Sequence, residues 1–90
     1  MHQYEIIESH LLNLLNIINS YISDEYKNEL QEFLHHGEYG IVYEDLCEII
    51  ALFKIPITSE NYRSISDLGK LMEYKNEIHL PLQKFVKSNP

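Results

Sequence analysis

Hydrophobic residues recur at intervals of three and four along most of the chain, which is the spacing of an amphipathic helix. The clearest run lies near the N-terminus, where the apolar positions are Ile7, Leu11, Leu14, Leu15 and Ile18. The pattern predicts a first helix over about residues 3–22.

Residues that start and stop helices divide the rest of the chain. Ser23 precedes an acidic turn and can cap a second helix, and Gly37 lies where a C-terminal glycine cap belongs. A third helix is predicted from about Glu38 to Lys54. Pro56 cannot continue it, and Thr58 can cap a fourth helix.

Each of these segments has an apolar face that we expect to point inward. The expected inward residues are Tyr26, Leu30, Phe33 and Leu34 in the second helix, Val42, Leu46, Ile49, Ile50 and Phe53 in the third, and Tyr62, Ile65, Leu68 and Met72 in the fourth. A last short helix is expected within "EYKNEIHLPLQKFVK", where Pro81 leaves its start open, and it would pack back through Ile78, Leu82, Phe85 and Val86. No run shows strand alternation. The prediction is one all-α domain over residues 1–90, a compact bundle of four to five helices.

The charge of the chain is acidic and unevenly distributed. The formal net charge is −7, in a composition that is 44% hydrophobic and 23% charged, as in a folded protein. Residues 1–50 carry ten acids and one base, Lys27, whereas residues 51–90 carry four acids and six bases. Few cations argue against direct nucleic-acid binding, and an acidic surface suits a basic protein partner.

We expect neither a secretion signal nor a membrane span in this chain. Its single cysteine, Cys47, cannot form an internal disulfide, and its first ten residues are acidic rather than basic. The apolar run at residues 11–18 is broken by asparagine and falls short of the roughly 20 residues that a membrane span needs. We expect a cytoplasmic protein without membrane contact.

A negative stripe on the third helix stands out. At 100° per residue, Glu44, Asp45 and Glu48 lie opposite Val42, and the apolar residues Ile41 and Leu52 lie among them. Tyr39 and Tyr43 adjoin the acids, and we expect them to be surface exceptions among tyrosines that otherwise belong to the core. The stripe is either a solvated helix face or a surface that binds a positively charged partner.

No set of residues predicts catalysis. Adjacent His35 and His36 point about 100° apart on a helix, so they cannot share one face as a His-x-x-x-His metal pair does, and we expect them to favour the helix dipole instead. Cys47 has acidic and apolar neighbours, which raise a thiol pKa. Glu44 and Glu48 lack a supporting polar cluster or an evident cleft. We therefore expect no enzyme activity, no metal and no cofactor.

The stretch from Phe33 to Leu71 resembles small bacterial immunity proteins of the Maf and contact-dependent growth inhibition type. The resemblance lies in "GEYGIVYEDLCEII" followed by "IPITSENYRSISDLGKLM". It covers about 40 of the 90 residues. Where the family tends to have alanine before the glutamate of its third helix, this chain has Val42 and Tyr43 before Glu44.

The resemblance implies an antidote that binds the C-terminal toxin domain of a large exported protein. Such toxins are commonly nucleases with basic substrate surfaces, and we expect a monomer that binds one toxin. The expected toxin-binding residues are Glu38, Tyr39, Glu44, Asp45 and Glu48, with Asp24, Glu25 and Glu32 further out. The alternative is a non-enzymatic helical adaptor or regulatory domain, in which the acids only keep the protein soluble.

Overall fold

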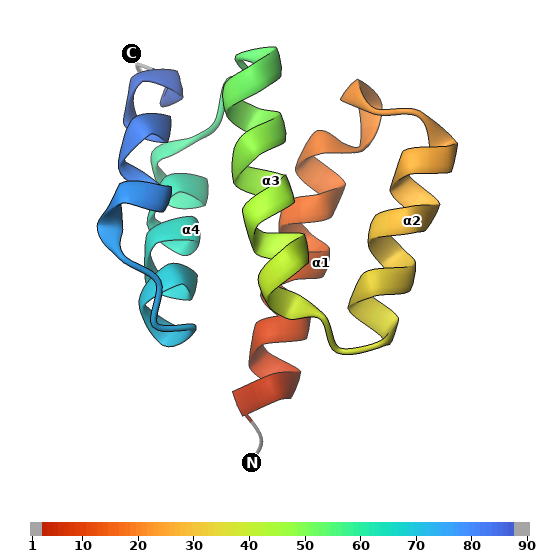
Figure 1. Cartoon of the computed structure of the whole chain (residues 1–90). Coiled ribbons are helices and arrows are strands. Elements are labelled where there is room, and N and C mark those ends of the chain that lie inside the picture. The colour runs from red at the N-terminus through yellow and green to blue at the C-terminus, as the bar shows by residue number, and fades with distance from the viewer. Residues whose placement is uncertain (1–2, 88–90) are drawn as a thin grey trace.

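A computed structural model describes residues 3–87 of the chain. It has four α-helices and three short 3₁₀ helices (Figure 1), which confirms the predicted all-α class. In order, they are α1 (Gln3–Ile18), η1 (Asn19–Tyr21), α2 (Asp24–His35), α3 (Tyr39–Phe53), α4 (Ser59–Leu71), η2 (Asn76–Ile78) and η3 (Leu80–Phe85). The first helix is thus shorter than predicted, because its last turn tightens into η1.

The predicted caps form as expected. The backbone N–H of Tyr26 donates to the Ser23 hydroxyl at 3.1 Å, and that of Asn61 donates to the Thr58 hydroxyl at 2.9 Å. These bonds satisfy amide groups that have no partner within the first turn of a helix. Gly37 follows α2 with a φ of 78°, a left-handed conformation that glycine adopts without strain.

The third helix occupies the centre of the molecule. In Figure 1, α3 has α2 on one side and α4 with the C-terminal segment on the other, and α1 runs behind it. Helices α1, α2 and η3 make the main contacts with α3 and leave its outer face to solvent. This outer face of α3 lies between α2 and the η2–η3 segment.

The core contains most of the predicted inward residues, with two corrections on α3. Tyr43, which we expected at the surface, is completely buried, because its hydroxyl bonds to the Ile65 carbonyl of α4 and its ring stacks on Tyr74. Phe53, which we expected inside, is 51% exposed, because it lies in the last turn of its helix. The fully buried large side chains include Leu11, Leu15, Ile18, Leu30, Leu46, Ile50, Ile65, Leu68 and Leu82.

The C-terminal segment is helical, as predicted, but forms 3₁₀ rather than α-helix. It is fixed to the α3–α4 connection by an isolated parallel bridge between Ile57 and Val86. The Ile57 N–H donates to the Phe85 carbonyl at 3.0 Å, and the Lys87 N–H donates to the Ile57 carbonyl at 2.8 Å. This attachment holds η2 and η3 beside α3 and α4.

Candidate functional site

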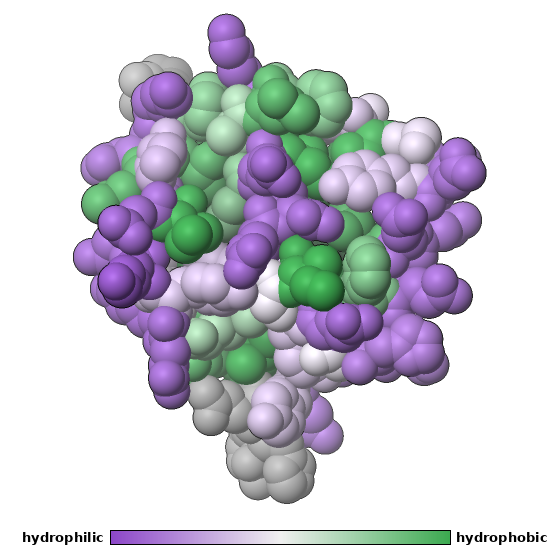
Figure 2. Space-filling view, viewed as in Figure 1, coloured by the Kyte–Doolittle hydropathy of each residue, from purple (hydrophilic) through white to green (hydrophobic). Residues whose placement is uncertain are grey.

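The outer face of α3 carries the predicted acidic stripe. Glu44 and Glu48 are exposed and Asp45 is half-buried. Ile41 and Leu52 lie on the same side, and 40% and 71% of their surfaces are exposed. Figure 2 views the molecule from this side and shows hydrophobic side chains separated by hydrophilic ones. The stripe therefore combines negative charge with exposed apolar surface.

Helix α2 extends the negative surface. Glu25, Glu29 and Glu32 are exposed and follow one another at spacings of four and three, so they share one flank of α2. Glu29 lies near enough to Asp45 of α3 to raise its pKa. We call the combined surface the acidic face, and it consists of Glu25, Glu29, Glu32, Glu44, Asp45 and Glu48. Glu29 was not among the residues predicted from the sequence.

The negative charges of the acidic face are not neutralised within the described part of the chain. Partial burial, followed by the negative charges of Glu48, Glu44 and Glu29, raises the pKa of the Asp45 carboxyl. Burial and three of these acids also raise the pKa of Tyr26, which lies half-buried on α2. Among residues 3–87 the one ion pair joins Lys27 to Asp24 at 3.8 Å. The acidic face thus repels itself and is free to attract a cation.

Glu44 is held in place by an aromatic pair. The Tyr74 hydroxyl donates to Glu44 Oε2 at 2.6 Å and also lies 3.3 Å from the Gly40 carbonyl. Burial and the hydrogen bond to Glu44 raise the pKa of Tyr74 to about 12, so the hydroxyl keeps its proton. The Tyr74 ring stacks on the buried Tyr43 at 5.1 Å between centroids. The core therefore orients one carboxylate of the acidic face.

Three of the predicted binding residues lie apart from the others or are already engaged. Asp24 pairs with Lys27. Tyr39 faces α1, where its hydroxyl donates to Glu8 Oε1 at 3.4 Å and its ring lies 6.0 Å from Tyr4. Glu38 is exposed at the start of α3, and its side chain makes no capping bond there. Glu44, Asp45 and Glu48, with Glu25 and Glu32 beside them, remain the coherent part of the prediction.

The other candidate residues take ordinary positions. Cys47 is 6% exposed, and burial together with the charge of Glu44 raises its pKa to about 12, although a hydrogen bond with Tyr43 opposes the shift. The thiol is therefore protonated at neutral pH. His35 and His36 are exposed, with rings inclined at 69°. Among residues 3–87 no three His, Cys, Asp or Glu side chains are arranged to hold a metal ion.

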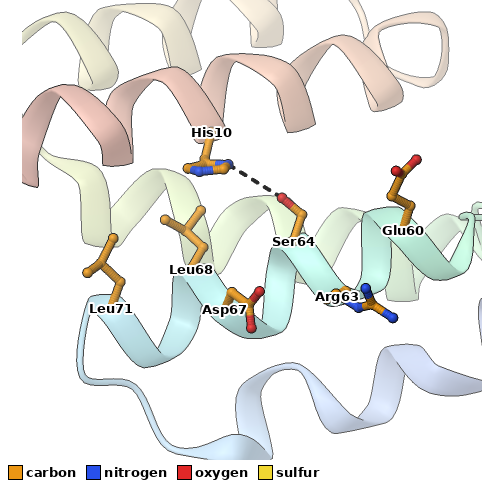
Figure 3. A pocket seen from close by; sticks show the side chains of 7 residues that line it. All are labelled: His10, Glu60, Arg63, Ser64, Asp67, Leu68 and Leu71. Atoms are coloured by element: carbon orange, nitrogen blue, oxygen red, sulfur yellow. Dashed lines mark hydrogen bonds between the residues drawn. The ribbon is translucent and has the colours of Figure 1, made fainter.

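A second polar site lies between α1 and α4. A cavity of about 330 Å³ is lined by residues that include His10, Arg63, Ser64 and Asp67 (Figure 3), and Ser64 Oγ lies 3.5 Å from His10 Nδ1. A serine nucleophile requires a base that a third group orients. Figure 3 shows the Asp67 carboxyl turned away from the His10 ring. The contact between Ser64 and His10 is therefore a polar contact between α4 and α1.

Comparison of the chain with protein-family models, with curated proteins and with solved structures finds no match. Within residues 3–87 no helix is both long enough and apolar enough to cross a bilayer. The acidic face is thus characterised by its own geometry and charge.

Proposed function

We propose that this chain is a non-enzymatic immunity protein. It binds the C-terminal toxin domain of a contact-dependent inhibition or related polymorphic toxin system in the cytoplasm and neutralises it. The observation that carries the proposal is the acidic face, whose carboxylates have no Lys or Arg partner among residues 3–87. The resemblance of residues 33–71 to such antidotes supplies the class of partner.

The acidic face has the chemistry to bind a basic protein surface. A toxin that acts on nucleic acid must attract phosphates, and carboxylates on α2 and α3 compete for the same cations. Opposite charge accelerates encounter, while buried apolar contacts supply much of the affinity. Ile41 and Leu52 provide such apolar surface within the charged region. A standard interface buries about 800 Å² on each partner, and the acidic face would form part of such an interface.

Repulsion within the acidic face also favours binding of a positively charged partner. Like charges one turn apart on a helix cost about 0.2–0.5 kcal/mol per pair, and burial of Asp45 adds to the cost. A bound cation removes this cost, so part of the binding free energy comes from the loss of repulsion that is present in the free protein. A merely solubilising surface does not need to concentrate its charges in this way.

Growth rescue in bacteria tests the proposal. We expect a toxin gene beside the gene for this chain, and cells that express its toxin domain should stop growing unless this chain is co-expressed. The variant Asp45→Lys with Glu48→Lys should bind about tenfold more weakly or worse and lose protection at low expression. The matched control, Asp67→Lys with Glu73→Lys, reverses two exposed acids on and after α4. Absence of rescue by the natural chain would contradict the proposal and favour the adaptor alternative.

A further inference from the structure

A groove lies between α3 and the η2–η3 segment, on the side of the acidic stripe that faces away from α2. Its volume is about 320 Å³. Glu44, Glu48 and Ala51 of α3 line one wall, and Glu77, Ile78 and Pro81 line the other. The groove exists because the bridge between Ile57 and Val86 holds the C-terminal segment beside α3. Glu77 was not among the residues predicted from the sequence.

The groove is apolar at its base and negative at its rim. Leu82 is buried and Ile78 half-buried, whereas Glu44, Glu48 and Glu77 are all exposed. None of these three carboxylates pairs with a Lys or Arg side chain in the described part of the molecule. Tyr74 holds Oε2 of Glu44 by a hydrogen bond. Carboxylates from two separate elements thus surround one hydrophobic trough.

We infer that this groove receives an arginine side chain from the protein partner, an assignment that rests on the proposed function and locates its anchor. Arginine carries an aliphatic stem that packs on apolar surface and a guanidinium that reaches into polar surroundings. Its planar fork of donors suits several carboxylates at once, better than the point charge of lysine. Arginine is also among the residues that dominate interface affinity.

Binding of arginine in this groove differs from general attraction of cations to the acidic face. General attraction depends on total charge, and any exposed carboxylate contributes to it. An arginine subsite depends instead on Glu48 and Glu77, which line the same groove from two separate elements. Ala51→Arg should therefore block it, because the new side chain starts within the groove wall and brings its own guanidinium to the same carboxylates.

A peptide titration followed by NMR tests the subsite without the toxin. The probe is acetyl-Gly-Arg-Gly-amide, added to the full ¹⁵N-labelled chain at low salt, and the matched probe replaces arginine with uncharged citrulline. We expect saturable shifts of backbone amides in residues 47–51 and 77–82 with the arginine peptide only. Glu48→Gln with Glu77→Gln should weaken binding about tenfold. Glu5→Gln with Glu60→Gln removes the same charge elsewhere and should leave binding unchanged.

Two results would overturn the inference. One is a set of shifts centred on α2 or spread evenly over the acidic surface, and the other is equal peptide binding by the Glu48 and Glu77 variant and its control. Binding of the toxin domain by Ala51→Arg separates the two proposals. Tight binding by both this variant and the natural chain would overturn the subsite and keep the immunity function. Peptide binding in the groove without toxin binding would keep the subsite and overturn the immunity function.

Discussion

Asp45 shows how a single residue links stability to binding. Its pKa is raised, so the folded chain holds the Asp45 proton more tightly than the unfolded chain does. Stability from this group is therefore greatest at low pH and is lost as pH rises from the unfolded pKa, 3.8, through the folded pKa. At neutral pH the charged carboxylate costs stability, and only a positive partner recovers that cost.

Replacement of Asp45 by asparagine should stabilise the free protein. We expect Asp45→Asn to raise the free energy of unfolding at pH 7 by about 0.5 kcal/mol, because it removes repulsion by Glu48 and Glu44. The gain should disappear below pH 3.8, where the carboxyl is protonated in both states. Urea denaturation at the two pH values measures it, with Asp67→Asn as the control on α4. A loss of stability at pH 7 would contradict the repulsion.

His79 gives the opposite pH dependence. It is 4% exposed, its Nδ1 has no hydrogen-bond partner among residues 3–87, and burial, with the nearby positive charge of Lys70, lowers its pKa. Its ring packs against Tyr62 of α4. The unfolded chain binds a proton below about pH 6.5 that the folded chain excludes, so stability should fall as pH drops from that value towards the folded pKa.

Substitution of His79 tests this dependence. His79→Gln should flatten the decline of unfolding free energy between about pH 6.5 and pH 5, whatever its effect on stability at pH 8. His35→Gln is the control, because His35 is exposed at the end of α2. Urea unfolding followed by circular dichroism across this range gives both slopes. Equal slopes in the natural chain and His79→Gln would contradict the role of the buried imidazole.

At the scale of elements, α3 and α4 pack against each other through Tyr43 and Gly69. The Tyr43 hydroxyl donates to the Ile65 carbonyl at 2.9 Å, in the interior of the bundle. A Cβ at Gly69 would lie 2.5 Å from the Tyr43 hydroxyl oxygen. Glycine normally weakens a helix interior, yet here it makes room for a buried hydrogen-bonded side chain.

A double-mutant cycle tests this fit. Gly69→Ala should lower the free energy of unfolding by about 1–3 kcal/mol because of overpacking, despite the higher helix propensity of alanine. Tyr43→Phe should cost about 0.5–1.5 kcal/mol through the lost hydrogen bond. In the double variant the clash with the hydroxyl is gone, so the combined cost should be smaller than the sum. Additive costs in urea denaturation would contradict the contact.

The sequence predicted helices better than it predicted which faces they bury. Periodicity and caps located all four α-helices, because Ser23 and Thr58 bond within a single turn. Tyr43 was misplaced because a central helix is covered by three neighbours, which no single apolar stripe indicates. The sequence also did not predict the 3₁₀ form of the C-terminal segment. The place of this segment beside α3 depends on the bridge between Ile57 and Val86, a contact between distant residues.

For the molecule as a whole, the imbalance of charge between the two halves of the chain predicted which half carries the negative surface. Ten acids in residues 1–50 predicted a negative surface, and Glu44, Asp45 and Glu48 form its centre. Glu29 and Glu77 could not be assigned from the sequence, because their places depend on how α2 and the η2–η3 segment pack beside α3. Tertiary packing therefore decides which acids act together.

Titration calorimetry of the natural chain with the C-terminal domain of the exported toxin that we expect beside its gene tests the central claim most directly. At two salt concentrations, we expect tight 1:1 binding that weakens as salt rises, because the acidic face attracts a basic surface that ions screen. Asp45→Lys with Glu48→Lys should bind more weakly and lose most of the salt dependence. Absence of binding would contradict the immunity function, and tight binding indifferent to salt would contradict the role of the acidic face.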